Sequence, residues 1–132
     1  ERMKVIEKVV REPEKAVEEV IEEVAEFPGE LRFGVADVKL ILDGVKTQVS
    51  RVNAPDAKVK VGAVVHACVW EPRFADLRVV TVERKRLKYF DEEDAKREGG
   101  YSLEEFKRVW KDAYGEWDEN QLIYIIQFQK TK

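Results

Sequence analysis

The chain is poor in the residues that build disulfide frameworks and metal centres. Its 132 residues include one cysteine, Cys68, and one histidine, His66. A single cysteine cannot form an intramolecular disulfide, and these two side chains fall short of the four ligands of a structural zinc site. We therefore expect no disulfide, no metal ion and no cofactor.

Long hydrophobic runs are also missing. No apolar stretch approaches the ~20 residues of a membrane-spanning helix, and the charged first residues do not resemble a signal peptide. We therefore expect a cytoplasmic domain with no membrane partner. The composition is 39% charged with a single methionine, against roughly 25% charged residues on average. Such an excess of Lys, Glu and Arg is typical of hyperthermophile proteins.

The net charge of −3 is unevenly distributed along the chain. Residues 1–30 carry five basic and ten acidic side chains, residues 31–90 carry twelve and six, and residues 91–132 carry seven and eleven. A positive middle segment therefore lies between two acidic ends. This pattern predicts a basic face for an anionic partner, although charges of this kind also serve solubility alone.

Residues 1–30 are predicted to form an acidic helical extension. Pro13 suits the first turn of a helix. After it, apolar residues recur at helical spacing with glutamates between them, namely Ala16, Val17, Val20, Ile21 and Val24. This apolar stripe has three candidate partners: the rest of the domain, a second copy in a homodimer, or another protein. In the last case the chain is a protein-interaction module.

Residues 31–132 are predicted to form one α+β domain, a small mixed β-barrel with flanking helices, because short strands and short helices follow one another without a βαβ rhythm. Ser102 with Glu105 forms a capping box for the last helix. We expect strands at 31–33, 59–70, 77–89 and 122–129, helices at 37–42, 91–99 and 103–114, and an irregular loop at 45–58.

The segment from Gly44 to Arg51 (GVKTQVSR) is the strongest candidate for a functional loop. A glycine after a helix permits a sharp turn and leaves backbone amides exposed. Lys46 and Arg51 add two cations, so the loop is predicted to bind an anion or a phosphate. Taken without its context, an ordinary surface turn explains the same residues.

A second group of cations lies on the strand expected at 77–89. Arg84, Arg86 and Lys88 share one face at a period of two. They predict a basic track that extends from the Lys46–Arg51 loop along an RNA ligand. Charges that protect an edge strand against aggregation would give the same pattern.

The aromatic residues near the C-terminus are divided between the core and a possible ligand. Trp110 and Tyr114 recur at helical spacing, so we expect them in the core with Val109 and Ala113. Trp117 lies in a loop between a helix and a strand. It is therefore the candidate for stacking on a base.

In their order, these segments resemble the ASCH family of PUA-like β-barrels. The family's Gly-x-Lys signature, with an Arg five residues after the Lys, is present as Gly44, Lys46 and Arg51, and the acidic helix, the capped helix and the final strand follow. The resemblance covers roughly residues 31–128 and implies a cleft that binds RNA or a modified nucleoside. With the basic track and the loop tryptophan added, the predicted RNA-binding residues are Gly44, Lys46, Thr47, Ser50, Arg51, Arg84, Arg86 and Trp117.

One bacterial branch of the family removes the acetyl group of N4-acetylcytidine with a Lys, a Thr and a Glu. The resemblance places Lys46 and Glu98 at two of these positions and Val49, which has no hydroxyl, at the third. Thr47 and Ser50 each need a different loop geometry to replace the Thr. The alternative to simple binding is an RNA-directed hydrolase, a divergent amidohydrolase or a ribonuclease, with Lys46 and Glu98 as catalytic residues. In either case we expect these two side chains within salt-bridge distance.

Overall fold

The computed structural model describes residues 28–70 and 72–131. The predicted N-terminal helix lies outside the described residues, as do the homodimer and the protein-interaction module that depend on it. The first strand begins at Glu30. In the part of the chain that is described, no helix is long and apolar enough to cross a membrane.

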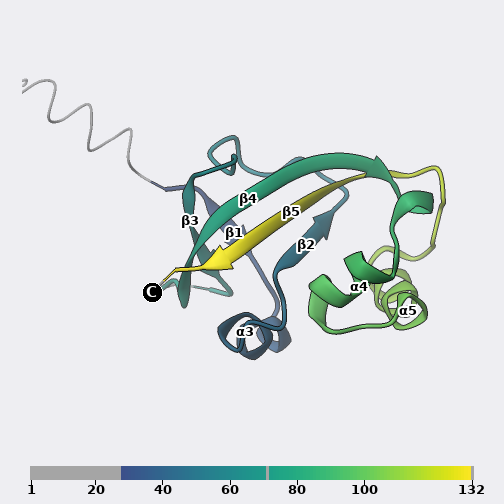
Figure 1. Cartoon of the computed structure of the whole chain (residues 1–132), viewed down its shortest axis with the longest axis horizontal. Coiled ribbons are helices and arrows are strands. Elements are labelled where there is room, and N and C mark those ends of the chain that lie inside the picture. The colour runs from purple at the N-terminus through teal and green to yellow at the C-terminus, as the bar shows by residue number, and fades with distance from the viewer. Residues whose placement is uncertain (1–27, 71, 132) are drawn as a thin grey trace, which may run out of the picture.

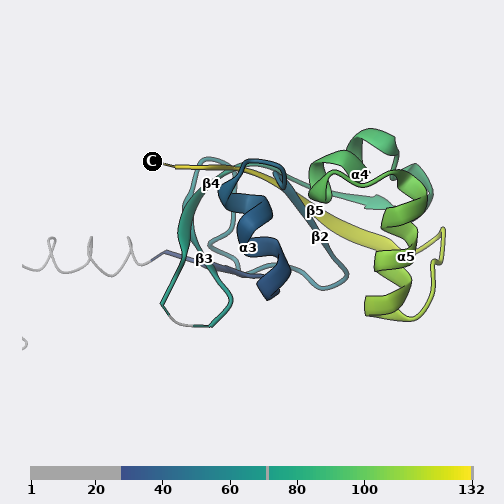
Figure 2. The same ribbon diagram turned by 90° about the horizontal axis from the view of Figure 1, so that it is seen from below.

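Strands and helices alternate irregularly along the described chain, which confirms the α+β class. The elements are β1 Glu30–Arg32, α3 Val35–Leu42, β2 Gln48–Arg51, β3 Val64–Cys68, β4 Ala75–Arg86, the 3-10 turn η1 Leu87–Tyr89, α4 Glu92–Gly99, α5 Leu103–Tyr114 and β5 Leu122–Lys130. Helices α4 and α5 lie together at one end of the strands, away from α3 (Figure 1 and Figure 2).

The strands form one five-stranded sheet in the order β1-β3-β4-β5-β2. The β1–β3 pair is parallel and the other pairs are antiparallel. The long strands β4 and β5 bend together (Figure 1), and a register shift between Val79 and Thr81 marks a bulge in β4. At the two sheet edges, the Arg51 guanidinium of β2 donates a hydrogen bond to the Arg32 carbonyl of β1. Closure of the sheet into a barrel stays a prediction.

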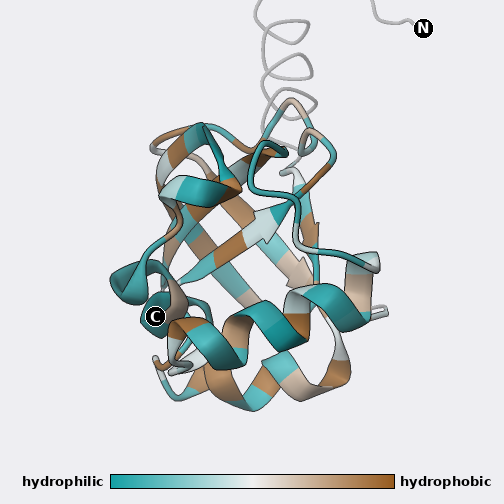
Figure 3. Cartoon of the chain, turned by 90° about the vertical axis from the view of Figure 1, so that its right-hand side faces the viewer, coloured by the Kyte–Doolittle hydropathy of each residue, from teal (hydrophilic) through white to brown (hydrophobic). Residues whose placement is uncertain are grey.

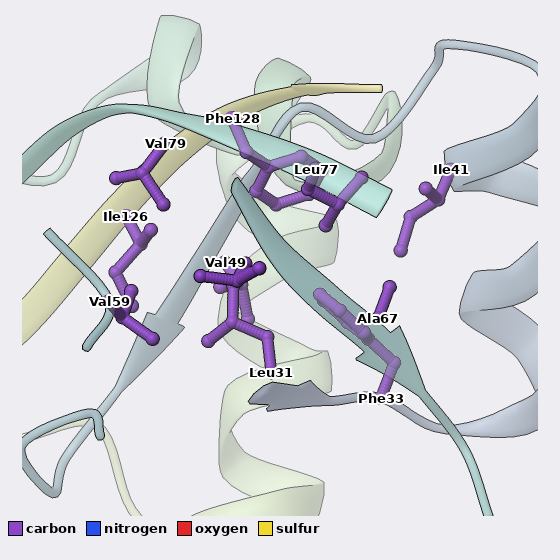
Figure 4. Close-up of a cluster of buried hydrophobic side chains, with 11 residues drawn as sticks. Leu31, Phe33, Ile41, Val49, Val59, Ala67, Leu77, Val79, Ile126 and Phe128 are labelled. Atoms are coloured by element: carbon purple, nitrogen blue, oxygen red, sulfur yellow. The ribbon is translucent and has the colours of Figure 1, made fainter. Parts of the chain in front are cut away.

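Strand β5 contributes to two hydrophobic cores from its two faces, because successive side chains in a strand point to opposite sides. Ile126 and Phe128 pack in the first core, with strands β1 to β4 and α3 (Figure 4). Ile123 and Ile125 pack in the second core, with α4 and α5. Along the helices, hydrophilic and hydrophobic residues alternate, as expected when a helix buries one face (Figure 3).

Helices α4 and α5 begin at capping residues, and the capping box predicted for α5 is confirmed. The Asp91 and Ser102 side chains accept hydrogen bonds from the backbone amides of Asp94 and Glu105, at 2.9 and 3.1 Å. Gly100 ends α4 with a φ of 79°, in the left-handed region that glycine adopts without strain. These boundaries depend on chemistry within a few residues of each helix end, which a sequence displays directly.

The strands differ from the prediction in three places. The segment 45–58, predicted as a loop, contains β2, and the strand predicted at 59–70 is limited to β3. The latter prediction was wrong because Gly62, with a φ of 88°, forms a turn there. Val59 is nevertheless buried. The alternating apolar pattern in the sequence therefore extends beyond the strand into residues that have another conformation. Strand β4 begins at Ala75 and gives way to the 3-10 turn after Arg86.

Candidate functional site

Lys46 and Glu98 meet between β2 and α4. The Lys46 Nζ lies 3.6 Å from Glu98 Oε1 and donates a hydrogen bond of 2.7 Å to the backbone carbonyl of Glu98. The two residues are 6% and 3% exposed. The expected proximity is therefore confirmed, and the pair is buried.

Two side chains of β2 hold the other carboxylate oxygen of Glu98. Gln48 donates from Nε2 to Glu98 Oε2 at 3.0 Å, and the Ser50 hydroxyl donates to the same oxygen. Gln48 and Ser50 share one face of β2, so both reach α4. Glu98 Oε1 keeps the greater spare capacity to accept a hydrogen bond from a ligand.

Arg97 sets the orientation of Gln48. Its Nε donates to Gln48 Oε1 at 2.9 Å. Since a guanidinium cannot accept a hydrogen bond, the amide nitrogen of Gln48 must face Glu98. Arg97 Nη2 also lies 2.9 Å from Oδ1 of the buried Asp94, whose Oδ2 lies 3.0 Å from Lys85 Nζ. A polar network therefore runs from β4 through α4 to β2.

The two buried carboxyls of this network have opposite pKa shifts. Burial raises the pKa of Glu98, because desolvation of the carboxylate outweighs the charge of Lys46 and the hydrogen bonds that Glu98 accepts. Burial also acts to raise the pKa of Asp94, but the hydrogen bond and charge of Lys85, with other hydrogen bonds, bring it below the ordinary value. Glu98 thus binds a proton more readily than a solvated glutamate, a property common in functional sites.

A cavity of about 200 Å³ opens beside the Lys46–Glu98 pair, and we call it the cleft. Its polar wall includes Lys46, Ser50, Glu98 and Asp37. Its aromatic wall includes Tyr101, Trp110 and Tyr114.

Helix α5 supplies much of the aromatic wall. The Trp110 and Tyr114 ring centroids lie 4.3 Å apart, and Trp110 is buried as expected. Tyr114 is 45% exposed, and Val109 and Ala113 are also exposed. The prediction that these three residues lie in the core is wrong, because this stripe of α5 borders the cleft.

Val49 and Ser50 lie on opposite faces of β2. The Val49 side chain belongs to the first core, where Figure 4 shows it close to Leu31 and Val59, although Val49 also borders the cleft. The Ser50 hydroxyl contacts Glu98. The hydroxyl that is absent at position 49 is thus present one residue later, on the face of the strand that carries the carboxyl.

The backbone turn at Gly44 has no amides exposed for an anion. Gly44 has a φ of 78°, as expected of a glycine that follows a helix. The amides of residues 44–46 donate to the carbonyls of Leu40 and Ile41 in the last turn of α3, at 2.9–3.1 Å, and the amide of Thr47 donates to a carbonyl of α4. The prediction of exposed amides is wrong because the carbonyls at the end of α3 need these donors.

The three arginines predicted to bind RNA lie outside the cleft. The Arg51 guanidinium is 5.6 Å from the centroid of the Phe33 ring. Arg51 lines a second cavity of about 470 Å³, which Tyr114 also lines. Arg84 and Arg86 are exposed on β4.

Trp117 packs against the second core. Its ring makes edge-to-face contacts with Phe90, Phe106 and Trp110. Lys107 Nζ lies 5.2 Å from the centroid of the Trp117 ring. Trp117 is not among the residues that line the cleft.

No metal centre is evident in the described ranges, where no three or more His, Cys, Asp or Glu side chains gather in a suitable group. Neither a protein-family model nor the sequence of a curated protein matches the chain.

Solved structures do resemble it. An ASCH domain from Lactobacillus crispatus superposes with a TM-score of 0.63 at 17% sequence identity, over 89% of each chain. A protein from Enterococcus faecalis gives a TM-score of 0.61 at 18% identity, over 89% of this chain and 86% of that one. A mutant form of the ZmASCH protein from Zymomonas mobilis gives 0.57 at 15% identity, over 80% and 73%. The chain has an ASCH-type fold.

Among the residues of this ASCH-type fold that were not predicted as site residues are Gln48, which donates to Glu98, and Tyr101, which lines the cleft. A signal for Gln48 was present, because Lys46, Gln48 and Ser50 recur at a period of two and form the polar side of a strand. Because residues 45–58 were predicted to be a loop, this alternation was not interpreted as a strand. The sequence carries no comparable signal for Tyr101, because its position in the cleft depends on how α4 and α5 pack.

Proposed function

We propose that the domain binds a single nucleobase, of RNA or of a free nucleoside, in the cleft. The observation that carries the proposal is that a cation, a hydroxyl and a carboxyl that are in contact with one another line a cavity together with aromatic rings. Small-molecule pockets typically measure ≈ 300–1,000 Å³, so a cavity of about 200 Å³ suits one flat ring system without its ribose. Proteins bind unpaired bases by this same combination of stacking and edge hydrogen bonds.

The polar wall keeps hydrogen-bonding capacity for a base edge. Lys46 Nζ has three N–H groups. One donates to the Glu98 carbonyl and another faces the Glu98 carboxyl, so the third is left for a ligand. The Ser50 oxygen and Glu98 Oε1 are left as acceptors. A base edge with an acceptor next to an amino or imino donor satisfies both groups, whereas an apolar ring leaves them without partners at a cost of about 1–3 kcal/mol each.

Calorimetric titration of the chain with the four ribonucleosides and N4-acetylcytidine tests the proposal. Tyr114→Ala removes an exposed ring of the cleft and should weaken binding by about 1–3 kcal/mol, the contribution of one base–aromatic stack. Tyr89→Ala is the matched control, since Tyr89 is 61% exposed and lies outside the cleft. Failure of every nucleoside to bind, or an equal loss in both variants, would contradict the proposal.

The Ser50–Glu98 contact favours a second candidate, an amidohydrolase acting on an acylated base. A hydroxyl, a carboxylate that can accept its proton and a nearby cation lie in contact. In this reaction Ser50 Oγ attacks the amide carbon, and its proton passes through Glu98 to the departing amine. Water then hydrolyses the serine ester, releases the acyl group as a carboxylic acid and restores the hydroxyl.

Acetate release from N4-acetylcytidine by the wild type and by Ser50→Ala tests the second candidate. Turnover that Ser50→Ala abolishes, while nucleoside binding persists, would support it. A wild type that releases no acetate would limit the cleft to binding. Turnover unaffected by Ser50→Ala would assign the chemistry to another group.

A further inference from the structure

A row of two arginines and one tyrosine crosses three neighbouring strands. Arg51 of β2 lies opposite Tyr124 of β5, and Tyr124 lies opposite Arg84 of β4. Directly opposite residues share one face of a sheet. Because neighbouring strands are ≈ 4.8 Å apart, the backbones of the two arginines are about 10 Å apart. Arg86 follows Arg84 on the same face, and we call these four residues the arginine strip.

Within the part of the chain that the structure describes, the cations of the arginine strip are not neutralised by ion pairs. Among the described residues, no carboxylate forms an ion pair with Arg51, Arg84 or Arg86. Arg51 and Arg86 donate to neutral backbone carbonyls, and the Arg84 guanidinium lies 5.1 Å from the centroid of the Tyr124 ring. A guanidinium has five N–H donors, so each arginine keeps donors for a ligand. Such a group, in a chain with more acidic than basic residues, points to an anionic partner.

Protection of a strand edge against aggregation explains the arginine strip less well than an anionic partner does. This part of β4 pairs with β5, whereas β3 pairs only with its beginning, so edge charges there would hinder aggregation. Charge of either sign serves that purpose. Here the alternation of the strand places Glu83 and Lys85 on the opposite face. The arginines instead share a face with Arg51, which lies two strands away beyond an aromatic ring.

The arginine strip leads toward the cleft at Arg51. This residue directly follows Ser50, whose hydroxyl belongs to the polar wall of the cleft. It also lines the cavity of about 470 Å³, and Tyr114 lines both that cavity and the cleft. A ligand that extends from the strip to the cleft therefore passes Arg51 and Tyr114.

We propose that the arginine strip binds a single-stranded nucleic acid whose neighbouring base enters the cleft. Phosphates contact Arg51, Arg84 and Arg86, and an unpaired base stacks on the Tyr124–Arg84 pair, as in other grooves that bind single strands. An acidic peptide would satisfy the cations but would leave the aromatic ring unused. The inference rests on the proposed function only in taking the cleft as the site of the neighbouring base. It identifies the ligand as a nucleic acid chain rather than a free nucleoside.

Fluorescence anisotropy of a short, labelled, unstructured RNA, titrated with the full chain at increasing salt, tests the inference. Three phosphate contacts predict a log–log slope of about −2, at roughly −0.7 per phosphate. Arg84→Ala should flatten the slope by about 0.7. Tyr124→Leu should lower the affinity at least about fivefold, the factor for 1 kcal/mol of lost stacking, without changing the slope. Arg108→Ala, an exposed arginine on α5 outside the strip, is the matched control.

The outcomes separate the arginine strip from the cleft. A slope that Arg84→Ala leaves unchanged would overturn the strip, and so would polyglutamate that displaces RNA as well as unlabelled RNA does. RNA binding that depends on Arg84 but not on Tyr114 would keep the strip and overturn the cleft. Nucleoside binding without salt-dependent RNA binding would do the reverse. Because Arg84 is exposed, its variant decides the matter even if Tyr124→Leu fails to fold.

Discussion

Removal of the cation beside Glu98 should destabilise the fold. In Lys46→Met the buried carboxyl loses an ammonium group at 3.6 Å, and the Glu98 carbonyl loses a hydrogen bond of 2.7 Å. Loss of one partner from a buried ion pair typically costs about 3–5 kcal/mol, because the remaining charge has neither its partner nor water. For a domain of this size we expect the Tm to fall by roughly 10–20 °C.

The destabilisation should be smaller in acid. Burial raises the pKa of Glu98 in the folded protein, and loss of Lys46 should raise it further because this cation opposes the shift. A carboxyl with a raised folded pKa binds a proton that the unfolded chain has already released. Its unfavourable effect is therefore absent below the unfolded value of about 4.3 and grows as the pH rises through the folded pKa. The loss of folding stability in Lys46→Met relative to wild type should therefore be smaller at low pH than at high pH.

Urea unfolding followed by circular dichroism, at about pH 4 and about pH 8, measures this difference. Lys39→Met is the control, because Lys39 makes a similar pair with Asp43 at 2.7 Å on the surface, where water screens it, and both midpoints should be unchanged. Glu98→Gln, added to Lys46→Met, should recover part of the loss by removing the unpaired charge. A Lys46→Met variant as stable as wild type, or equally destabilised at both pH values, would refute the reasoning.

Three further substitutions test individual residues. Gly99→Ala places a Cβ 2.8 Å from Tyr101 Cε2, so the ring must move and nucleoside affinity should fall in calorimetry; unchanged affinity would remove Tyr101 from the site. Val49→Thr puts a hydroxyl into the first core and should cost about 1–3 kcal/mol in urea unfolding without raising acetate release above that of the wild type, and a rise in acetate release would contradict the importance of Ser50. Trp117→Phe removes an indole N–H that is buried without a partner and should leave RNA anisotropy unchanged, whereas weaker binding would restore Trp117 as a stacking residue.

The helices could be predicted from the sequence because their ends depend on local chemistry. Asp91 and Ser102 cap α4 and α5 by hydrogen bonds that span three residues. Strand β2 could not be predicted in the same way. It has four residues, and it becomes a strand by pairing with β5, more than seventy positions later. The local signal of so short a segment is the alternation of Lys46, Gln48 and Ser50, which by itself does not distinguish a strand from a loop.

The candidate site, too, was predictable only in part, because its residues come from distant segments of the chain. The Lys46–Glu98 contact was expected from a family resemblance, because nothing in the spacing of two residues so far apart places them together. Tyr114 was predicted in the core because helical spacing identifies the residues that share a face, but not what that face meets. At the end of α5 the face meets the cleft, so an apolar stripe became a wall of a cavity.

The two faces of β2 explain why the cleft and the arginine strip are neighbours. Gln48 and Ser50 point toward Glu98, whereas Val49 and Arg51 lie on the other face, with the first core and the strip. Thr47, the residue before β2, fixes the register of this short strand. Its amide donates to α4 at 2.8 Å and its carbonyl accepts from β5 at 2.9 Å. A slip by one residue would exchange the faces and remove the hydroxyl from the cleft and the guanidinium from the strip together. The backbone of Thr47, predicted as an RNA contact, therefore supports both proposed sites from a position between α4 and β5.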